Sequence, residues 1–174
     1  MAAVKQLTLS QVNALDHESF VRVLGPVFEH SPWVAAATWI QRPFHDVAQL
    51  HQALRQTVSE AGEARQLALI RAHPDLVGRA ALAGTLTHTS TGEQASAGLN
   101  QLTPQEIGLF QKHNAAYKEK FGFPFVICAR LNKKAAILAG FERRLKNSQP
   151  QEIKTALEEI SKIAELRLRD LISI

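Results

Sequence analysis

The stretch RAHPDLVGRAALAGTLTHTSTGEQASAGL, residues 71–99, brings two helical segments together across a loop rich in Gly, Thr and Ser. Pro74 disfavours helical backbone at the residue before it, so the helix arriving through residues 67–70 is expected to end at His73. Ser90, with Glu93 three residues later, has the pattern of a helix start in which Ser90 is the N-cap. A helix start offers unpaired N–H groups and a positive dipole end to an anion. The stretch therefore predicts a site where an imidazole, a carboxylate and an anion-receptive helix start converge.

Each polar residue of this stretch also has a purely structural interpretation. A histidine at a helix end, such as His73, is commonly a cap or a surface residue. Asp75 is able to cap a helix that begins at Leu76. If Ser90 and Glu93 form a capping box, the Glu93 carboxylate turns back to the backbone and does no chemistry. These patterns alone leave catalysis and capping open.

Helix signals recur along the whole chain, and strand signals are scarce. Cap residues or prolines precede apolar positions at helical spacing near Asp16, Ser31-Pro32, Asp46, Thr103-Pro104 and Ser148-Pro150. Glu106, three residues after Thr103, is expected to complete a capping box, and Gly62 and Gly122 are expected to end helices. The expected fold class is all-α, with a single compact multi-helix domain over residues 1–174, a length that suffices for one substantial core.

Two further segments place polar groups in apolar surroundings. The run FGFPFVICA, residues 121–129, lacks a helical pattern, and Pro124 favours an extended chain from Phe125 to Cys128. Buried extended backbone needs hydrogen-bond partners, so the run either binds a ligand or connects elements through the core. In the final helix, Arg167 falls inside an apolar stripe. A charge there is costly unless it is paired or binds an anion; snorkelling at the edge of the stripe is the alternative.

Composition excludes several classes of protein and site. The single cysteine, Cys128, leaves no internal disulfide or multi-cysteine zinc site, and the seven histidines form no metal-binding pair. Phosphate-loop and dinucleotide glycine patterns are absent. The net charge of +4 comes without a nucleic-acid-binding motif and indicates a solvated surface that attracts small anions. With no secretion signal, membrane-length apolar run or peroxisomal address, we expect a cytoplasmic protein without membrane or nucleic-acid partners.

Four motifs occur in order along the chain: HPDLVGR at 73–79, S-x-x-E-Q-x-x-A-G-L at 90–99, Y-x-x-K-F-G-F-P-F-V-I-C-A-R at 117–130 and K-I-A-E-L-R-L at 162–168. Together they resemble the OHCU (2-oxo-4-hydroxy-4-carboxy-5-ureidoimidazoline) decarboxylases of ureide metabolism. The resemblance implies an all-α fold of that family's type, a homodimer and no cofactor. It also implies the last step of urate degradation, in which OHCU loses carbon dioxide to give (S)-allantoin.

The resemblance also implies roles, position by position. The expected catalytic residues are His73 as the general acid and Arg167 facing an anion. From the chemistry of the substrate, Glu93 is expected to orient His73 or bind the ring hydroxyl, a role with which capping competes. The expected substrate-binding residues are Pro74, Ser90, Thr91, Gly92, Glu93, Gln94, Phe125, Val126, Ile127, Cys128, Ala129 and Arg167, with backbone groups important at 125–129. Two other interpretations remain: a helical module that binds an acidic protein or nucleic acid without catalysis, and another cofactor-free lyase or hydrolase acting on a related ureido or purine-derived ring.

Overall fold

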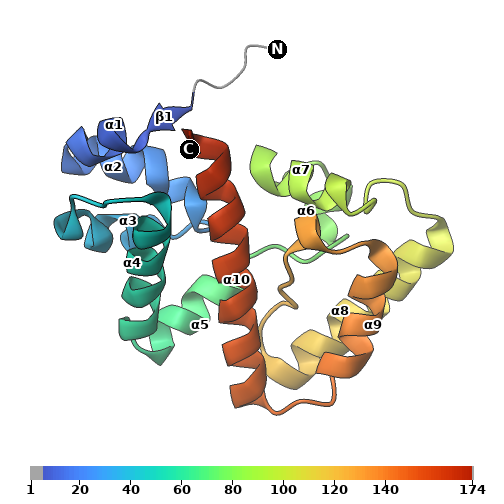
Figure 1. Ribbon diagram of the computed structural model, residues 1–174. Helices are drawn as coiled ribbons and strands as arrows, with labels where there is room; N and C mark the ends of the chain where they lie inside the picture. The colour runs from blue at the N-terminus through green and yellow to red at the C-terminus, as the bar shows by residue number, and fades with distance from the viewer. Residues whose placement is uncertain (1–5, 174) are drawn as a thin grey trace. The chain divides into compact units, whose positions relative to one another are not determined.

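The structure is a computed structural model that describes residues 6–173, the side chain of Ala80 excepted. Backbone contacts divide the chain into two compact units, residues 1–72 with 161–174 and residues 73–160. Helix α10 (Gln149–Leu171) contributes to both units. The described residues are mostly helical, which confirms the predicted all-α class (Figure 1). That residues 1–174 act as one domain stays a prediction.

In the first unit, helix α3 (Trp33–Thr38) packs against both α2 (His17–Leu24) and α4 (Val47–Glu60). Their apolar faces bury side chains such as Phe20 and Leu50. The remaining elements are α1 (Leu9–Ala14), η1 (Gly25–Val27), η2 (Trp39–Gln41), α5 (Glu63–Arg71) and the strands β1 (Leu7–Thr8) and β2 (Ile172–Ser173). The two strands, which the sequence did not predict, pair in parallel and bring the two ends of the described chain together (Figure 1).

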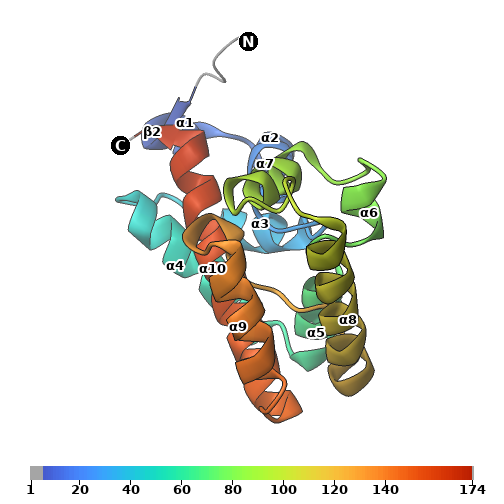
Figure 2. The same ribbon diagram turned by 90° about the vertical axis from the view of Figure 1, so that its right-hand side faces the viewer.

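The second unit is built around an aromatic core. Besides the first part of α10 it contains α6 (Arg79–Leu82), α7 (His88–Ser96), α8 (Pro104–Phe121), η3 (Ala129–Leu131) and α9 (Lys134–Arg144). Helices α8 and α9 pack on each other (Figure 2), and α7 packs on η3. Phe125 stacks on Phe141 with ring centroids 3.8 Å apart and meets the ring of Tyr117 edge-on. The segment between α8 and η3 therefore runs through the core, and its residues 124–128 form neither helix nor strand.

Local sequence signals explain most helix ends. The carboxylates of Asp16 and Asp46 accept backbone hydrogen bonds in the first turns of α2 and α4, as predicted. Thr103 and Glu106 form the predicted capping box at the start of α8. Gly122 ends that helix in the left-handed conformation, with φ of 76°, which glycine adopts without steric cost.

The helix predicted to have Ser31 as its N-cap differs in detail. Pro32 occupies the cap position of α3 without a side-chain hydrogen bond. The hydroxyl of Ser31 donates instead to the carbonyl of Glu29 at 2.9 Å. The predicted cap is therefore wrong, because a short polar side chain can bond to the turn before a helix as readily as to the helix itself.

Candidate functional site

The loop that begins with His73 has a strained backbone. Helix α5 ends at Arg71, close to the predicted stop, and His73 is 8% exposed. Val77 has a positive φ of 52°, which is rare for a β-branched residue. A Cβ atom at Gly78 would lie 2.5 Å from that of Asp75, so only glycine fits there. The loop is folded tightly on itself directly after the predicted catalytic histidine.

Two buried amides hold this loop in place. The side chain of Gln94 in α7 accepts a hydrogen bond from the N–H of Val77 at 3.1 Å and donates to the carbonyl of Asp75 at 3.3 Å. Asn114 in α8 donates to the carbonyl of Leu76 at 2.8 Å. Gln94 was predicted to bind substrate. In the structure its amide connects α7 to the loop, so it has at least a structural role.

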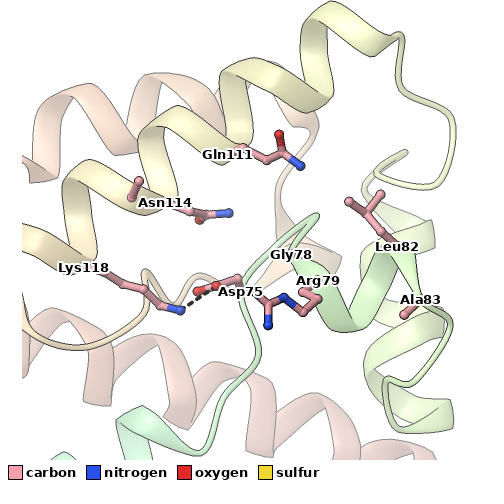
Figure 3. A pocket seen from close by; sticks show the side chains of 9 residues that line it. Asp75, Gly78, Arg79, Leu82, Ala83, Gln111, Asn114 and Lys118 are labelled. Carbon is pink, nitrogen blue, oxygen red and sulfur yellow. Dashed lines mark hydrogen bonds and ion pairs between the residues drawn. The ribbon is translucent and has the colours of Figure 1, made fainter.

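The predicted capping role of Asp75 is wrong. The backbone turns at residues 76 and 77, and α6 begins only after Gly78. The Asp75 carboxylate instead forms an ion pair with Lys118 of α8, with Nζ and Oδ2 2.6 Å apart (Figure 3). Both side chains line an open pocket of about 590 Å³, where Arg79 and Gln111 also lie (Figure 3). The ion pair is thus a third connection between the loop and the helices of the second unit.

Helix α7 starts earlier than predicted, and this changes the interpretation of Glu93. Thr87 is its N-cap and accepts a hydrogen bond from the N–H of Ser90 at 3.1 Å. Ser90 is therefore a buried residue of the first turn, and the predicted capping box of Ser90 and Glu93 is wrong. Because Glu93 lies inside the helix, its carboxylate is not needed for capping.

Glu93 and the extended run come together in the second unit. Burial raises the pKa of the Cys128 thiol, and the carboxylates of Glu159 and Glu93 raise it further. Glu93 is thus close enough to the end of the run to act on Cys128 electrostatically. Lys133, the residue before α9, donates to the carbonyl of Ser96 at 3.1 Å and so links the start of α9 to the end of α7. The thiol of Cys128 is buried and its pKa is raised, which favours an inert thiol over a nucleophile.

Arg167 lies in the part of α10 that belongs to the first unit. Its guanidinium forms an ion pair with Glu29, with Nη2 and Oε2 2.9 Å apart, and donates to the carbonyls of Pro26 and Val27. The side chain is buried, so the snorkelling alternative is wrong. The partner Glu29 was not predicted from the sequence. A shared pocket for Arg167 and His73 stays a prediction.

A second buried ion pair was missed as well. Arg144 of α9 and Glu152 of α10 are buried, with Nε and Oε1 2.7 Å apart. Tyr117 donates its hydroxyl to the same carboxylate, and burial followed by this hydrogen bond raises the pKa of Tyr117. Arg144 also donates to the carbonyl of Val126 at 2.7 Å. The signal was present, because Arg144 is three residues beyond Phe141 on the apolar face of its helix.

The described part of the chain, residues 6–173, contains no group of three His, Cys, Asp or Glu side chains placed to hold a metal ion. Within the same residues, no helix has the length and apolar character needed to cross a membrane.

Comparison with known proteins gives a consistent result. Residues 13–169 match the sequence profile of OHCU decarboxylase. Relatives named 2-oxo-4-hydroxy-4-carboxy-5-ureidoimidazoline decarboxylase are 45% identical in Haloferax volcanii, over 97% of this chain and 98% of the relative, and 45% identical in Amia calva, over 95% of each. The crystal structure of (S)-allantoin synthase matches with a TM-score of 0.78 and 28% identity, over 96% of this chain and 54% of that chain. A crystal structure of OHCU decarboxylase in the presence of (S)-allantoin shares the fold, with a TM-score of 0.70 and 24% identity over 92% of this chain and all of the other. Since the profile and these relatives span nearly the whole sequence, the chain belongs to the OHCU decarboxylase family.

Proposed function

We propose that this chain catalyses the cofactor-free decarboxylation of OHCU to (S)-allantoin, the last step of urate degradation, with His73 as the general acid. The observation that carries the proposal is membership of the family over residues 13–169, at up to 45% identity to relatives that bear the enzyme's name. The site residues of the second unit support it, since they provide a buried imidazole and a carboxylate.

The proposed chemistry follows from the substrate. The bond between the ring carbon and its carboxylate breaks, carbon dioxide leaves, and the electron pair enters the adjacent C=N system of the ring. The nitrogen of that system takes up the proton that the ring hydroxyl releases as it becomes a carbonyl. His73 donates a proton to one face of that system, which lowers the barrier and sets the handedness of the product. Imidazole suits this role because its unperturbed pKa of about 6.5 allows proton transfer near neutrality. The hydrogen bonds from Gln94 and Asn114 to the following loop support a fixed orientation of His73.

The other roles are proposed from the same resemblance. Glu93 orients His73 or binds the ring hydroxyl, and its position inside α7 agrees with a role other than capping. Arg167 binds an anionic or carbonyl oxygen of the substrate through its planar guanidinium. The remaining residues bind the substrate: Pro74, Ser90, Thr91, Gly92, Gln94, Phe125, Val126, Ile127, Cys128 and Ala129. In the run at residues 125–129, backbone groups bind the ureido or ring amides and the apolar side chains exclude water.

We also propose that the enzyme is a cytoplasmic homodimer in which residues 1–174 act as one domain. The family match extends over both compact units, which supports a joint function. The homodimer is proposed from the family resemblance alone. Light scattering coupled to size-exclusion chromatography tests the dimer: a monomer at the concentrations used for assays would contradict it.

A matched pair of histidine variants tests the assignment of the general acid. His73→Asn should lose nearly all acceleration of decarboxylation and still bind (S)-allantoin. The control, His45→Asn, changes an exposed histidine of the first unit and should keep wild-type turnover. Near wild-type turnover of His73→Asn would remove His73 from the acid role.

Arg167→Lys retains the charge but loses the planar fork, so unaltered kinetics would argue against substrate binding by Arg167.

A further inference from the structure

We propose that Glu159 is a positioning residue: its carboxylate fixes the extended run at residues 125–128 so that the backbone N–H and C=O of Ile127 face the substrate's ureido or ring amide groups. The inference rests on the proposed function, since it concerns how the same site holds OHCU. It adds a residue of α10 that no motif singled out.

The first observation is the way Cys128 is held. The Glu159 carboxylate accepts a hydrogen bond from the N–H of Cys128, with Oε2 and N 2.8 Å apart. The carbonyl of Cys128 accepts from the side-chain amide of Asn132 at 2.9 Å and from the N–H of Leu131 at 3.1 Å. Both backbone groups of Cys128 are therefore used within the protein.

The second observation is a matching contact two residues earlier. The carbonyl of Val126 accepts a hydrogen bond from Arg144 at 2.7 Å, and Arg144 is itself held by Glu152 at 2.7 Å. Glu152 and Glu159 are seven residues apart in α10, and this spacing places both carboxylates on one face of the helix. One face of α10 thus holds the run directly at Cys128 and, through Arg144, at Val126.

The third observation is that the side chains of the run alternate between its two faces. A Cβ atom on Gly140 of α9 would lie 3.5 Å from Phe125 and 3.8 Å from Ile127, so both side chains face the same helix. Side chains two residues apart share a face in an extended chain. In such a chain the backbone polar groups of successive residues point to opposite edges. The groups of Ile127 therefore point away from the edge that Arg144 and Glu159 hold.

The edge to which the backbone groups of Ile127 point is the one that we expect a ligand to contact. No hydrogen bond within residues 6–173 involves the N–H or C=O of Ile127, although the residue is only 9% exposed. Buried backbone groups are almost always paired, and an N–H beside a C=O is complementary to an amide or ureido group. The electrostatic effect of Glu93 on the Cys128 thiol places this part of the run near a predicted catalytic residue.

The experiment compares three variants of one helix. Glu159→Ala removes the acceptor, Glu159→Gln keeps an acceptor oxygen without the charge, and Glu158→Ala changes the exposed neighbouring carboxylate as a control. Steady-state kinetics with OHCU formed in situ give KM and kcat separately. Hydrogen–deuterium exchange of a peptide covering residues 125–129 gives the protection of the run, with and without (S)-allantoin.

For Glu159→Ala we expect kcat/KM to fall by roughly 10- to 100-fold, mainly through a higher KM. The backbone N–H and C=O of Ile127 would be displaced and would bind the substrate more weakly. The run should lose protection in the free protein, and Glu159→Gln should restore both measurements. If Glu159→Ala kept the wild-type KM and the wild-type protection from hydrogen exchange, the positioning role of Glu159 would be overturned and the proposed function would stand. The same would hold if Glu159→Gln behaved like Glu159→Ala. A wild-type protein without activity on OHCU would overturn the proposed function, and the positioning role with it. If Glu159→Ala fails to fold, the KM of Glu159→Gln decides: a wild-type value supports the acceptor role, and a raised value contradicts it.

Discussion

Replacing Glu152 by alanine removes the acceptor at the centre of the second unit's polar network. Its side chain is fully buried and accepts hydrogen bonds from Tyr117, from Arg144 at 2.7 Å and from Asn147 at 2.9 Å. After the change, the guanidinium of Arg144 is still buried but has lost its counter-charge. The carbonyl of Val126, at 2.7 Å, is the main acceptor left to it.

The expected loss of stability is large. Removing one member of a buried ion pair costs about 3–5 kcal/mol, because the remaining charge stays in a medium that solvates it poorly. Domains are typically stable by only about 5–15 kcal/mol, so the variant is expected to unfold on the order of 10 °C below the wild type. The control Glu158→Ala changes an exposed carboxylate of the same helix and should stay within about 0.5 kcal/mol of the wild type.

Urea unfolding followed by circular dichroism measures these differences as free energies of unfolding. The double variant Arg144→Met with Glu152→Leu removes both charges and should recover part of the loss, since no uncompensated charge is then buried. If Glu152→Ala were as stable as Glu158→Ala, or if the double variant were less stable than the single one, the reasoning about the buried pair would be refuted.

Three smaller predictions concern the caps and the thiol. Thr103→Ala should lower the free energy of unfolding by about 1 kcal/mol in urea titrations because it loses the capping box of α8, whereas Thr103→Ser should retain most of it. The backbone N–H of Ser19 holds the pKa of Asp16 below its ordinary 3.8, so the stabilisation is present above that pH and is lost as the pH falls through the lower folded-state value. Asp16→Asn should therefore flatten the decline of the urea midpoint between pH 6 and pH 2; an unchanged decline would contradict the capping role. Burial raises the pKa of Cys128, so iodoacetamide at pH 8 should alkylate the folded protein far more slowly than the urea-unfolded chain, and equal rates would show that the thiol is accessible.

Sequence was sufficient where a structural signal is contained within one turn. The capping box of Thr103 and Glu106 and the end of α8 at Gly122 depend on residues close together in the chain, and both were predicted. The start of α7 was not, because Thr87 and Ser90 both fit the pattern of an N-cap. The choice between them depends on tertiary packing, which buries Ser90 in the first turn of the helix.

Sequence was least informative about long-range pairing. The helical position of Arg167 placed it in an apolar stripe and left open whether the charge is paired or snorkels, because its partner Glu29 is 138 residues away in the chain. Arg144 belongs to a basic cluster that resembles a solvated surface, although its helical phase relative to Phe141 indicates the core. The contact of Glu159 with the N–H of Cys128 has no local sequence signal, because it depends on how the extended run crosses α10.

The most direct test is to form OHCU from urate with the two upstream enzymes and to follow the circular dichroism of the allantoin produced. With the wild-type protein we expect rapid appearance of the (S)-allantoin signal, and with His73→Asn only the slow signal of the spontaneous reaction. Identical traces with and without the wild-type protein would contradict the proposed decarboxylation. A fast trace with His73→Asn would contradict the role of His73 alone.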